Sequence, residues 1–156
     1  MSKTVSQAKA KLRGKRKQQY AALPVQFTDD GQIQVLLLTS RGTGRWVVPK
    51  GWPMPKLSPA GAAAREAFEE AGVEGTVNGK DPLGTYPYAK ALKGGRHINV
   101  QVTVFLLIVE NQLDEWPEQA QRERCWHDRQ EAADLVAEPE LAAIIRDLDA
   151  ACLTAA

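Results

Sequence analysis

The sequence has little of what marks a small crosslinked domain or a membrane span. Its 156 residues include only two cysteines, Cys125 and Cys152, which lack metal-ligand spacing. We therefore expect both to be reduced structural thiols. The longest stretch without a charged residue is 97–109, thirteen residues, whereas a helix that crosses a bilayer needs about 20. These scarcities exclude a disulfide miniprotein and a membrane-spanning chain.

The overall composition is that expected of one soluble globular domain. Hydrophobic residues make up 44% and charged residues 25%, which is ordinary for a chain long enough to bury a core. The N-terminus is basic but has no apolar run after it, so no secretory signal is predicted. The cytoplasm is therefore the expected location.

Charge is distributed unevenly along the chain. Residues 1–17 hold seven of the 20 basic residues and no acid, which leaves 13 basic residues against 19 acids, or −6, on the rest. We predict a basic N-terminal arm over 1–19 and a single domain over 20–153. The arm is interpreted as a solvated helical extension, as a segment that attracts a polyanion or RNA, or as a mitochondrial presequence.

The hydrophobic pattern predicts a mixed α/β domain. Ser58 and Pro59 are typical of a helix start, and Gly72 is typical of a helix end. Strands are expected at 21–27, 32–39, 46–48, 83–88 and 98–109, and helices at 59–71, 131–136 and 139–153.

Three glutamates in the first predicted helix point to a metal. Glu66, Glu69 and Glu70 stand at i, i+3 and i+4, so an α-helix would project them from one face. Like charges at this spacing repel, and the end of a helix disfavours negative charge. Oxygen ligands without His or Cys select Mg²⁺ or Mn²⁺. The alternative is a solvated acidic face on which Arg65 pairs with Glu69.

Residues 51–73 read GWPMPKLSPAGAAAREAFEEAGV, which resembles the Nudix box G-x5-E-x7-R-E-U-x-E-E-x-G-U, where U is aliphatic. The matching positions are Gly51, Arg65, Glu66, Glu69, Glu70, Gly72 and Val73. Leu57 replaces the first glutamate of the box, and Ala67 replaces a larger aliphatic residue. The loss of a carboxylate at Leu57 leaves the number of bound metal ions open.

Other segments resemble the diphosphoinositol polyphosphate phosphohydrolase branch of this family. They are the stretch SRGTGRWVVP at 40–49, together with residues 114–116, 122–126 and 131–133. The resemblance implies a Nudix-type α/β/α sandwich with a mixed β-sheet. It also implies that water directly attacks a phosphoanhydride bond, with diadenosine or diphosphoinositol polyphosphates favoured over ADP-ribose.

The resemblance assigns expected roles to single residues. Glu66, Glu69, Glu70 and the backbone carbonyl of Lys50 would hold Mg²⁺ or Mn²⁺, and Arg65 would orient Glu69. Glu66 or an acid outside the box would accept the proton of the attacking water. The resemblance also implies that Arg41 and Arg45 contact substrate phosphates.

The charge pattern adds Lys50, Lys90, Arg96 and His97 as expected substrate-binding residues, because together with Lys93 they could form a basic rim. The alternative for the four residues of the loop, Lys90, Lys93, Arg96 and His97, is the solvated tip of a hairpin.

Residues outside the box carry weaker expectations. We expect His127 at the surface and Trp46 and Trp126 in the core, whereas Trp52 either borders the substrate mouth or braces its loop.

Two other functions remain open. Leu57 motivates a ligand-binding module with weakened catalysis, and the basic arm motivates removal of pyrophosphate from RNA 5′ ends. The main partner expected is a small-molecule polyphosphate, without a membrane and without nucleic acid other than an RNA 5′ end.

Overall fold

One mixed β-sheet of eight strands organises the chain, which a computed structural model describes over residues 17–149. The strands are β1 (Lys17–Phe27), β2 (Ile33–Thr39), β3 (Trp46–Val47), β4 (Lys50–Gly51), β5 (Val73–Val77), β6 (Gly84–Ala91), β7 (His97–Gln112) and β8 (Arg124–Asp128). The central order is β3-β2-β1-β7-β5, with β4 on β1, β6 on β7 and β8 on β2. Strands β1 and β7 run parallel, and the other pairs run antiparallel.

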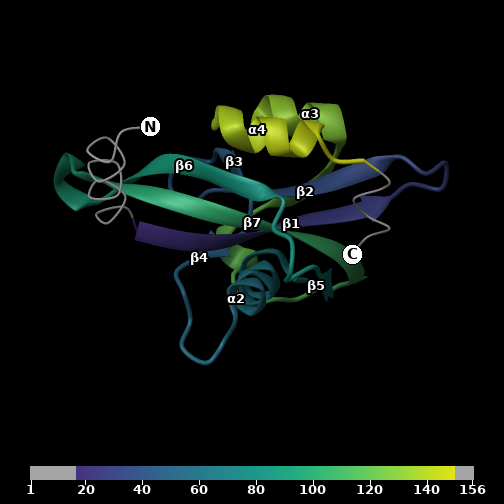
Figure 1. Cartoon of the computed structure of the whole chain (residues 1–156), viewed down its shortest axis with the longest axis horizontal. Coiled ribbons are helices and arrows are strands. Elements are labelled where there is room, and N and C mark those ends of the chain that lie inside the picture. The colour runs from purple at the N-terminus through teal and green to yellow at the C-terminus, as the bar shows by residue number, and fades with distance from the viewer. Residues whose placement is uncertain (1–16, 150–156) are drawn as a thin grey trace, which may run out of the picture.

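Helices cover both faces of this sheet (Figure 1). Helices α3 (Arg129–Leu135) and α4 (Pro139–Arg146) pack on one face, and α2 (Pro59–Glu66) packs on the other. Successive side chains of a strand point to opposite faces, so Leu37 joins the core under α3 and α4 while Leu36 and Leu38 join the core under α2. The predicted α/β/α sandwich with a mixed sheet is confirmed.

The helix that carries the box ends differently from the prediction. Its last turn, Ala67–Ala71, is a π-helical turn (η1) that continues α2 and ends at Gly72. Ser58 caps the start as predicted, because its hydroxyl accepts a hydrogen bond from the Gly61 amide at 3.0 Å.

Several other boundaries differ from the sequence prediction. Strands β4, β5 and β8 were not predicted, and β1 begins at Lys17, inside the expected arm. Helix α4 ends at Arg146, short of the predicted 153. Residues 1–16 of the arm and Cys152 lie outside the described residues, and the boundary between arm and domain stays a prediction.

The expectation for His127 was wrong. Its side chain is buried on β8, where it packs edge-on against Trp46 with 5.0 Å between ring centroids. Trp46 and Trp126 are half-buried and pack against the two cores, as expected. Cys125 is an exposed free thiol, so it does not fill the core. Within residues 17–149, no helix is long and apolar enough to cross a membrane.

Candidate active site

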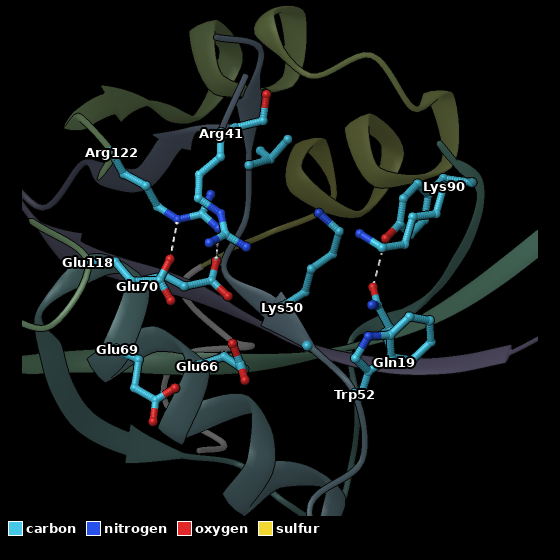
Figure 2. Close-up of a pocket in the computed structure, with 14 residues that line it drawn as sticks. Gln19, Arg41, Lys50, Trp52, Glu66, Glu69, Glu70, Lys90, Glu118 and Arg122 are labelled. Carbon is cyan, nitrogen blue, oxygen red and sulfur yellow. Dashed lines mark hydrogen bonds and ion pairs between the residues drawn. The ribbon is translucent and has the colours of Figure 1, made fainter. Parts of the chain in front are cut away.

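A cavity of about 450 Å³ opens beside the end of the box helix (Figure 2). Strands β1, β4 and β6, the turn η1, and the segments after β2 and β7 all contribute to its lining. Its charged members are four cations and four anions: Arg41, Lys50, Lys90 and Arg122, and Glu66, Glu69, Glu70 and Glu118. The formal charge of the lining is therefore balanced.

Two glycines of the box are required by close contacts. A side chain on Gly51 would place its Cβ 2.4 Å from the Glu66 carboxyl group, so glycine lets that carboxyl lie against β4. Gly72 adopts a positive φ of 66°, and a Cβ there would lie 2.7 Å from the Trp116 ring. Both positions fix where the end of the helix sits relative to the cavity.

The π-helical turn separates the three glutamates of the box. A turn wider than that of an α-helix brings residues i and i+4 closer to alignment and moves i+3 away. Glu66 and Glu70 thus lie together, whereas Glu69 turns toward Arg65, whose Nε lies 3.0 Å from Glu69 Oε1. Figure 2 shows Glu69 pointing away from Glu70. Among the described residues, no three metal-ligating side chains form a cluster.

Glu118 and Arg122 line the cavity beside Glu70, and we call the side of the cavity formed by Glu70, Glu118 and Arg122 the acidic wall. The sequence analysis did not place Glu118 or Arg122 in the site. Arg122 lies 3.5 Å from Glu70 and 2.9 Å from Glu118, and it also donates to the Thr39 carbonyl at 3.2 Å. Their spacing of four residues was the one available signal, since it suits an ion pair. Nothing in the sequence showed that the pair faces Glu70.

Burial controls the protonation of two groups in this site. Glu70 is 5% exposed, and burial, reinforced by its contact with Glu66, raises its pKa to about 9 despite the Arg122 guanidinium. Burial also lowers the pKa of Lys50 to about 8, against the pull of Glu70 and Glu138. Lys50 Nζ lies 5.1 Å from the centroid of the Tyr88 ring.

The donor set fits a hard divalent cation. The buried carboxyl group of Glu70 resists ionisation and lies beside the carboxyl group of Glu66, which packs against Gly51. Both offer oxygen ligands only, which is the chemistry that Mg²⁺ and Mn²⁺ prefer. Glu66 and Glu70 therefore suit such an ion, while Glu69 and the Lys50 carbonyl stay predicted ligands.

The expected substrate-binding residues divide into two groups. Arg41, Lys50 and Lys90 line the cavity. Arg45 lies outside its lining, 4.0 Å from Glu138, and Arg96 and His97 are exposed at the far end of the β6–β7 hairpin. Trp52 is 41% exposed and lines the cavity, so it borders the mouth rather than only bracing its loop.

Known proteins resemble this chain along most of its described length. Residues 17–148 match the model of the NUDIX domain. The chain is 36% identical over 114 residues to Nudix hydrolase 13, mitochondrial, of Arabidopsis thaliana, covering 68% of this chain and 54% of that protein. It is 34% identical over 109 residues to diphosphoinositol polyphosphate phosphohydrolase 3-beta of Bos taurus, covering 68% of this chain and 62% of that protein. The matches thus span between half and two thirds of these relatives.

A solved structure shows the same fold. The C. elegans Ap4A hydrolase in a binary complex has a TM-score of 0.61 at 21% identity, over 83% of this chain and 93% of that one. The predicted resemblance to the family, and to relatives of the diphosphoinositol polyphosphate phosphohydrolase branch, is confirmed. Because the NUDIX domain model matches most of the chain, including the helix and loop that build this cavity, the protein belongs to the Nudix family.

Proposed function

We propose that this protein hydrolyses a phosphoanhydride bond of a nucleoside or inositol polyphosphate with the help of Mg²⁺ or Mn²⁺. Diadenosine polyphosphates and diphosphoinositol polyphosphates are the favoured substrates. The observation that carries the proposal is the pair of Glu66 and Glu70 in a cavity that also holds Arg41, Lys50 and Lys90. Carboxylates suit the metal ion, and the three cations suit phosphate oxygens.

The side chains of the cavity have separate tasks in this proposal. A bound divalent cation would neutralise phosphate charge and lower the pKa of water. Glu66 and Glu70 would hold it, while Arg41, Lys50 and Lys90 would orient the polyphosphate chain. The proton of the attacking water would pass to a carboxylate, either Glu66 or Glu118, which is the acid outside the box in the cavity lining.

The alternative of a binding module with weakened catalysis has less support. Leu57 is 46% exposed and does not line the cavity, so the missing glutamate leaves the pair of Glu66 and Glu70 in place. The RNA alternative depends on the basic arm, which lies largely outside the described residues. The cytoplasmic location also stays a prediction.

A substrate panel tests the proposal directly. Phosphate release or product formation would be measured for ADP-ribose, diadenosine hexaphosphate and a diphosphoinositol phosphate, with Mg²⁺ and with EDTA. We expect turnover that depends on the metal and a higher kcat/KM for one of the longer polyphosphates. Binding without turnover in any metal would support the module, and a clear preference for ADP-ribose would contradict the substrate class.

A further inference from the structure

Two segments that are far apart in the sequence are joined beside the cavity. The amide of Thr39, at the end of β2, donates to the Glu123 carbonyl at 3.0 Å, and the Glu123 amide donates to Thr39 Oγ1 at 2.9 Å. Arg122 adds a third hydrogen bond, from its guanidinium to the Thr39 carbonyl at 3.2 Å. The backbone of the segment between β7 and β8 is therefore fixed against the segment that follows β2.

The loop after β2 fixes its own backbone but not the side chain of Arg41. The Ser40 amide donates to the Arg45 carbonyl at 2.7 Å, and the Gly44 amide donates to the Ser40 carbonyl at 3.1 Å, so the loop is closed at its base. The Arg41 side chain leaves this loop and points into the cavity (Figure 2). A long side chain has many rotamers, so a closed loop alone does not determine where the guanidinium lies.

Gln121 makes the contact that fixes this guanidinium. Arg41 Nη1 donates to Gln121 Oε1 at 3.0 Å. Within residues 17–149, this is the one hydrogen bond of the Arg41 side chain, which forms no ion pair there. Gln121 ends the 3₁₀ turn η3 (Gln119–Gln121), and its amide donates to the Glu118 carbonyl at 2.9 Å. Because Arg122 follows it directly, the acceptor is carried by backbone that is held on both sides.

The neutral amide of Gln121 leaves the charge of Arg41 available to a ligand. A guanidinium has five N–H donors, so one bond to Gln121 leaves most of them for phosphate oxygens. An amide oxygen accepts a hydrogen bond without cancelling the positive charge, whereas a carboxylate would neutralise it. The cavity lining already has as many anions as cations, so a further carboxylate beside Arg41 would oppose an anionic ligand.

We propose that Gln121 is a positioning residue that holds the Arg41 guanidinium in the cavity, ready to bind the phosphates of the substrate. The inference rests on the proposed function and deepens it, because Gln121 does not line the cavity and acts through Arg41. A binding reaction loses affinity when it must immobilise a long side chain. A guanidinium that Gln121 already holds avoids part of this loss.

Gln121→Met tests the proposal, because methionine keeps the side-chain volume but lacks the amide oxygen. KM and kcat would be measured for diadenosine hexaphosphate in saturating Mg²⁺. We expect KM to rise about threefold, since Arg41 would have to be ordered by the substrate, while kcat stays within about twofold and the Tm is unchanged. Gln119→Met is the matched control: Gln119 lies in the same turn, but its Nε2 donates to the Asp114 carbonyl at 2.8 Å. It should leave KM unchanged.

A double-mutant cycle separates positioning from a local structural effect. If Gln121 acts through Arg41, adding Gln121→Met to Arg41→Ala should raise KM no further than Arg41→Ala alone. Fold changes that multiply in the double variant would overturn the inference, because they would show that Gln121 acts without Arg41.

Calorimetric binding of inorganic tripolyphosphate in EDTA distinguishes this inference from the hydrolase proposal, because it requires no turnover. Tripolyphosphate affinity that falls about threefold in Gln121→Met, and does not fall in Gln119→Met, supports the positioning role even if no substrate is hydrolysed. Affinity that falls in Arg41→Ala but is unchanged in Gln121→Met overturns the positioning role and leaves the hydrolase proposal intact.

Discussion

Glu69 and Glu70 are adjacent in the sequence but differ in their surroundings. The pair of Glu69 and Arg65 is open to solvent, so its contribution to stability is small, about 0–1 kcal/mol. Glu70 is buried with Glu66 and Arg122, and its raised pKa means that the fold resists its ionised form. Of the two side chains, Glu70 is the one whose ionised form costs the fold stability, which makes it a candidate for a functional role.

Glu70→Gln should therefore stabilise the metal-free protein increasingly as the pH rises. An unfolded glutamate ionises near 4.5, whereas folded Glu70 holds its proton up to about 9. Between these values the folded state binds more protons than the unfolded state, so the wild type loses stability with rising pH. The Tm difference between Glu70→Gln and wild type should grow from about pH 5 to pH 9 in thermal unfolding with EDTA.

Glu69→Gln is the matched control for this measurement, because Glu69 is half-exposed and paired with Arg65. It should show no such trend across the same pH range. A Tm difference for Glu70→Gln that stays constant with pH would show that Glu70 ionises normally in the fold.

The two arginines before the box should differ in their effect on substrate binding. Arg41 lines the cavity, whereas Arg45 lies outside its lining, near Glu138. Arg41→Ala should raise KM for diadenosine hexaphosphate about tenfold, since charged hydrogen bonds contribute roughly 1.5–3 kcal/mol. Arg45→Ala should change it by less than about twofold in the same steady-state assay. Equal effects of the two variants would contradict this division.

Much of the cavity could be predicted from single residues, but its balance of charge could not. The spacing of the box predicted Glu66 and Glu70, the resemblance predicted Arg41, and the basic loop between two predicted strands suggested Lys90. Arg122 reaches Glu70 across 52 positions of sequence, a contact that depends on how the segment after β7 folds back. Local spacing carries no information about such a contact.

Among the secondary-structure elements, the junction between β4 and α2 controls the position of Glu66. Gly51→Ala should displace the Glu66 carboxyl, because the added Cβ would lie 2.4 Å from it. We expect Mn²⁺ affinity, measured by calorimetry, to fall about tenfold or more, with a loss of turnover. Gly61→Ala in α2 is the control, since its Cβ would meet the Ser58 hydroxyl at 3.1 Å and Leu57 at 3.6 Å but not Glu66. Unchanged Mn²⁺ affinity in Gly51→Ala would separate Glu66 from the metal site.

Leu57, the residue before the helix cap Ser58, should matter less for metal binding than Gly51 does. Leu57 is exposed and faces a different groove, beside Arg65 and Phe68. Leu57→Glu should change metal affinity or kcat by less than about tenfold, roughly 1.4 kcal/mol, in an Mg²⁺ titration of turnover. If the wild type is inactive and Leu57→Glu restores hydrolysis, the protein is a natural binding module.

One physical reason explains why strands β4, β5 and β8 were not predicted from the sequence. Strand β4 has two residues after a proline, and β5 contains Gly75 at a register shift against β7. Strand β8 reads RCWHD and is held by its pairing with β2. Such segments have weak intrinsic preference for a strand, so tertiary pairing determines their conformation. The π-helical turn could not be predicted from the sequence either, because its residues AFEEA also suit an α-helix.

The arrangement of the molecule explains why distant segments meet at the cavity. The segment between β7 and β8 folds over the end of the box helix, whose last carbonyls need donors. Trp116 Nε1 donates to Glu70 O at 3.0 Å, the Glu118 amide donates to Glu69 O at 3.0 Å, and Arg124 donates to Ala71 O at 2.7 Å. These bonds hold the acidic wall against the helix and bring Glu118 and Arg122 to the cavity.

Hydrolysis of diadenosine hexaphosphate by wild type and Glu70→Gln in saturating Mg²⁺ tests the proposed metal-dependent chemistry most directly. The wild type should turn over with Mg²⁺ and stop with EDTA. Glu70→Gln should lose at least about 100-fold in kcat, roughly 2.7 kcal/mol, while its Tm stays equal to or above that of the wild type. Near-normal turnover by Glu70→Gln would contradict the assignment of this buried carboxylate to the catalytic metal.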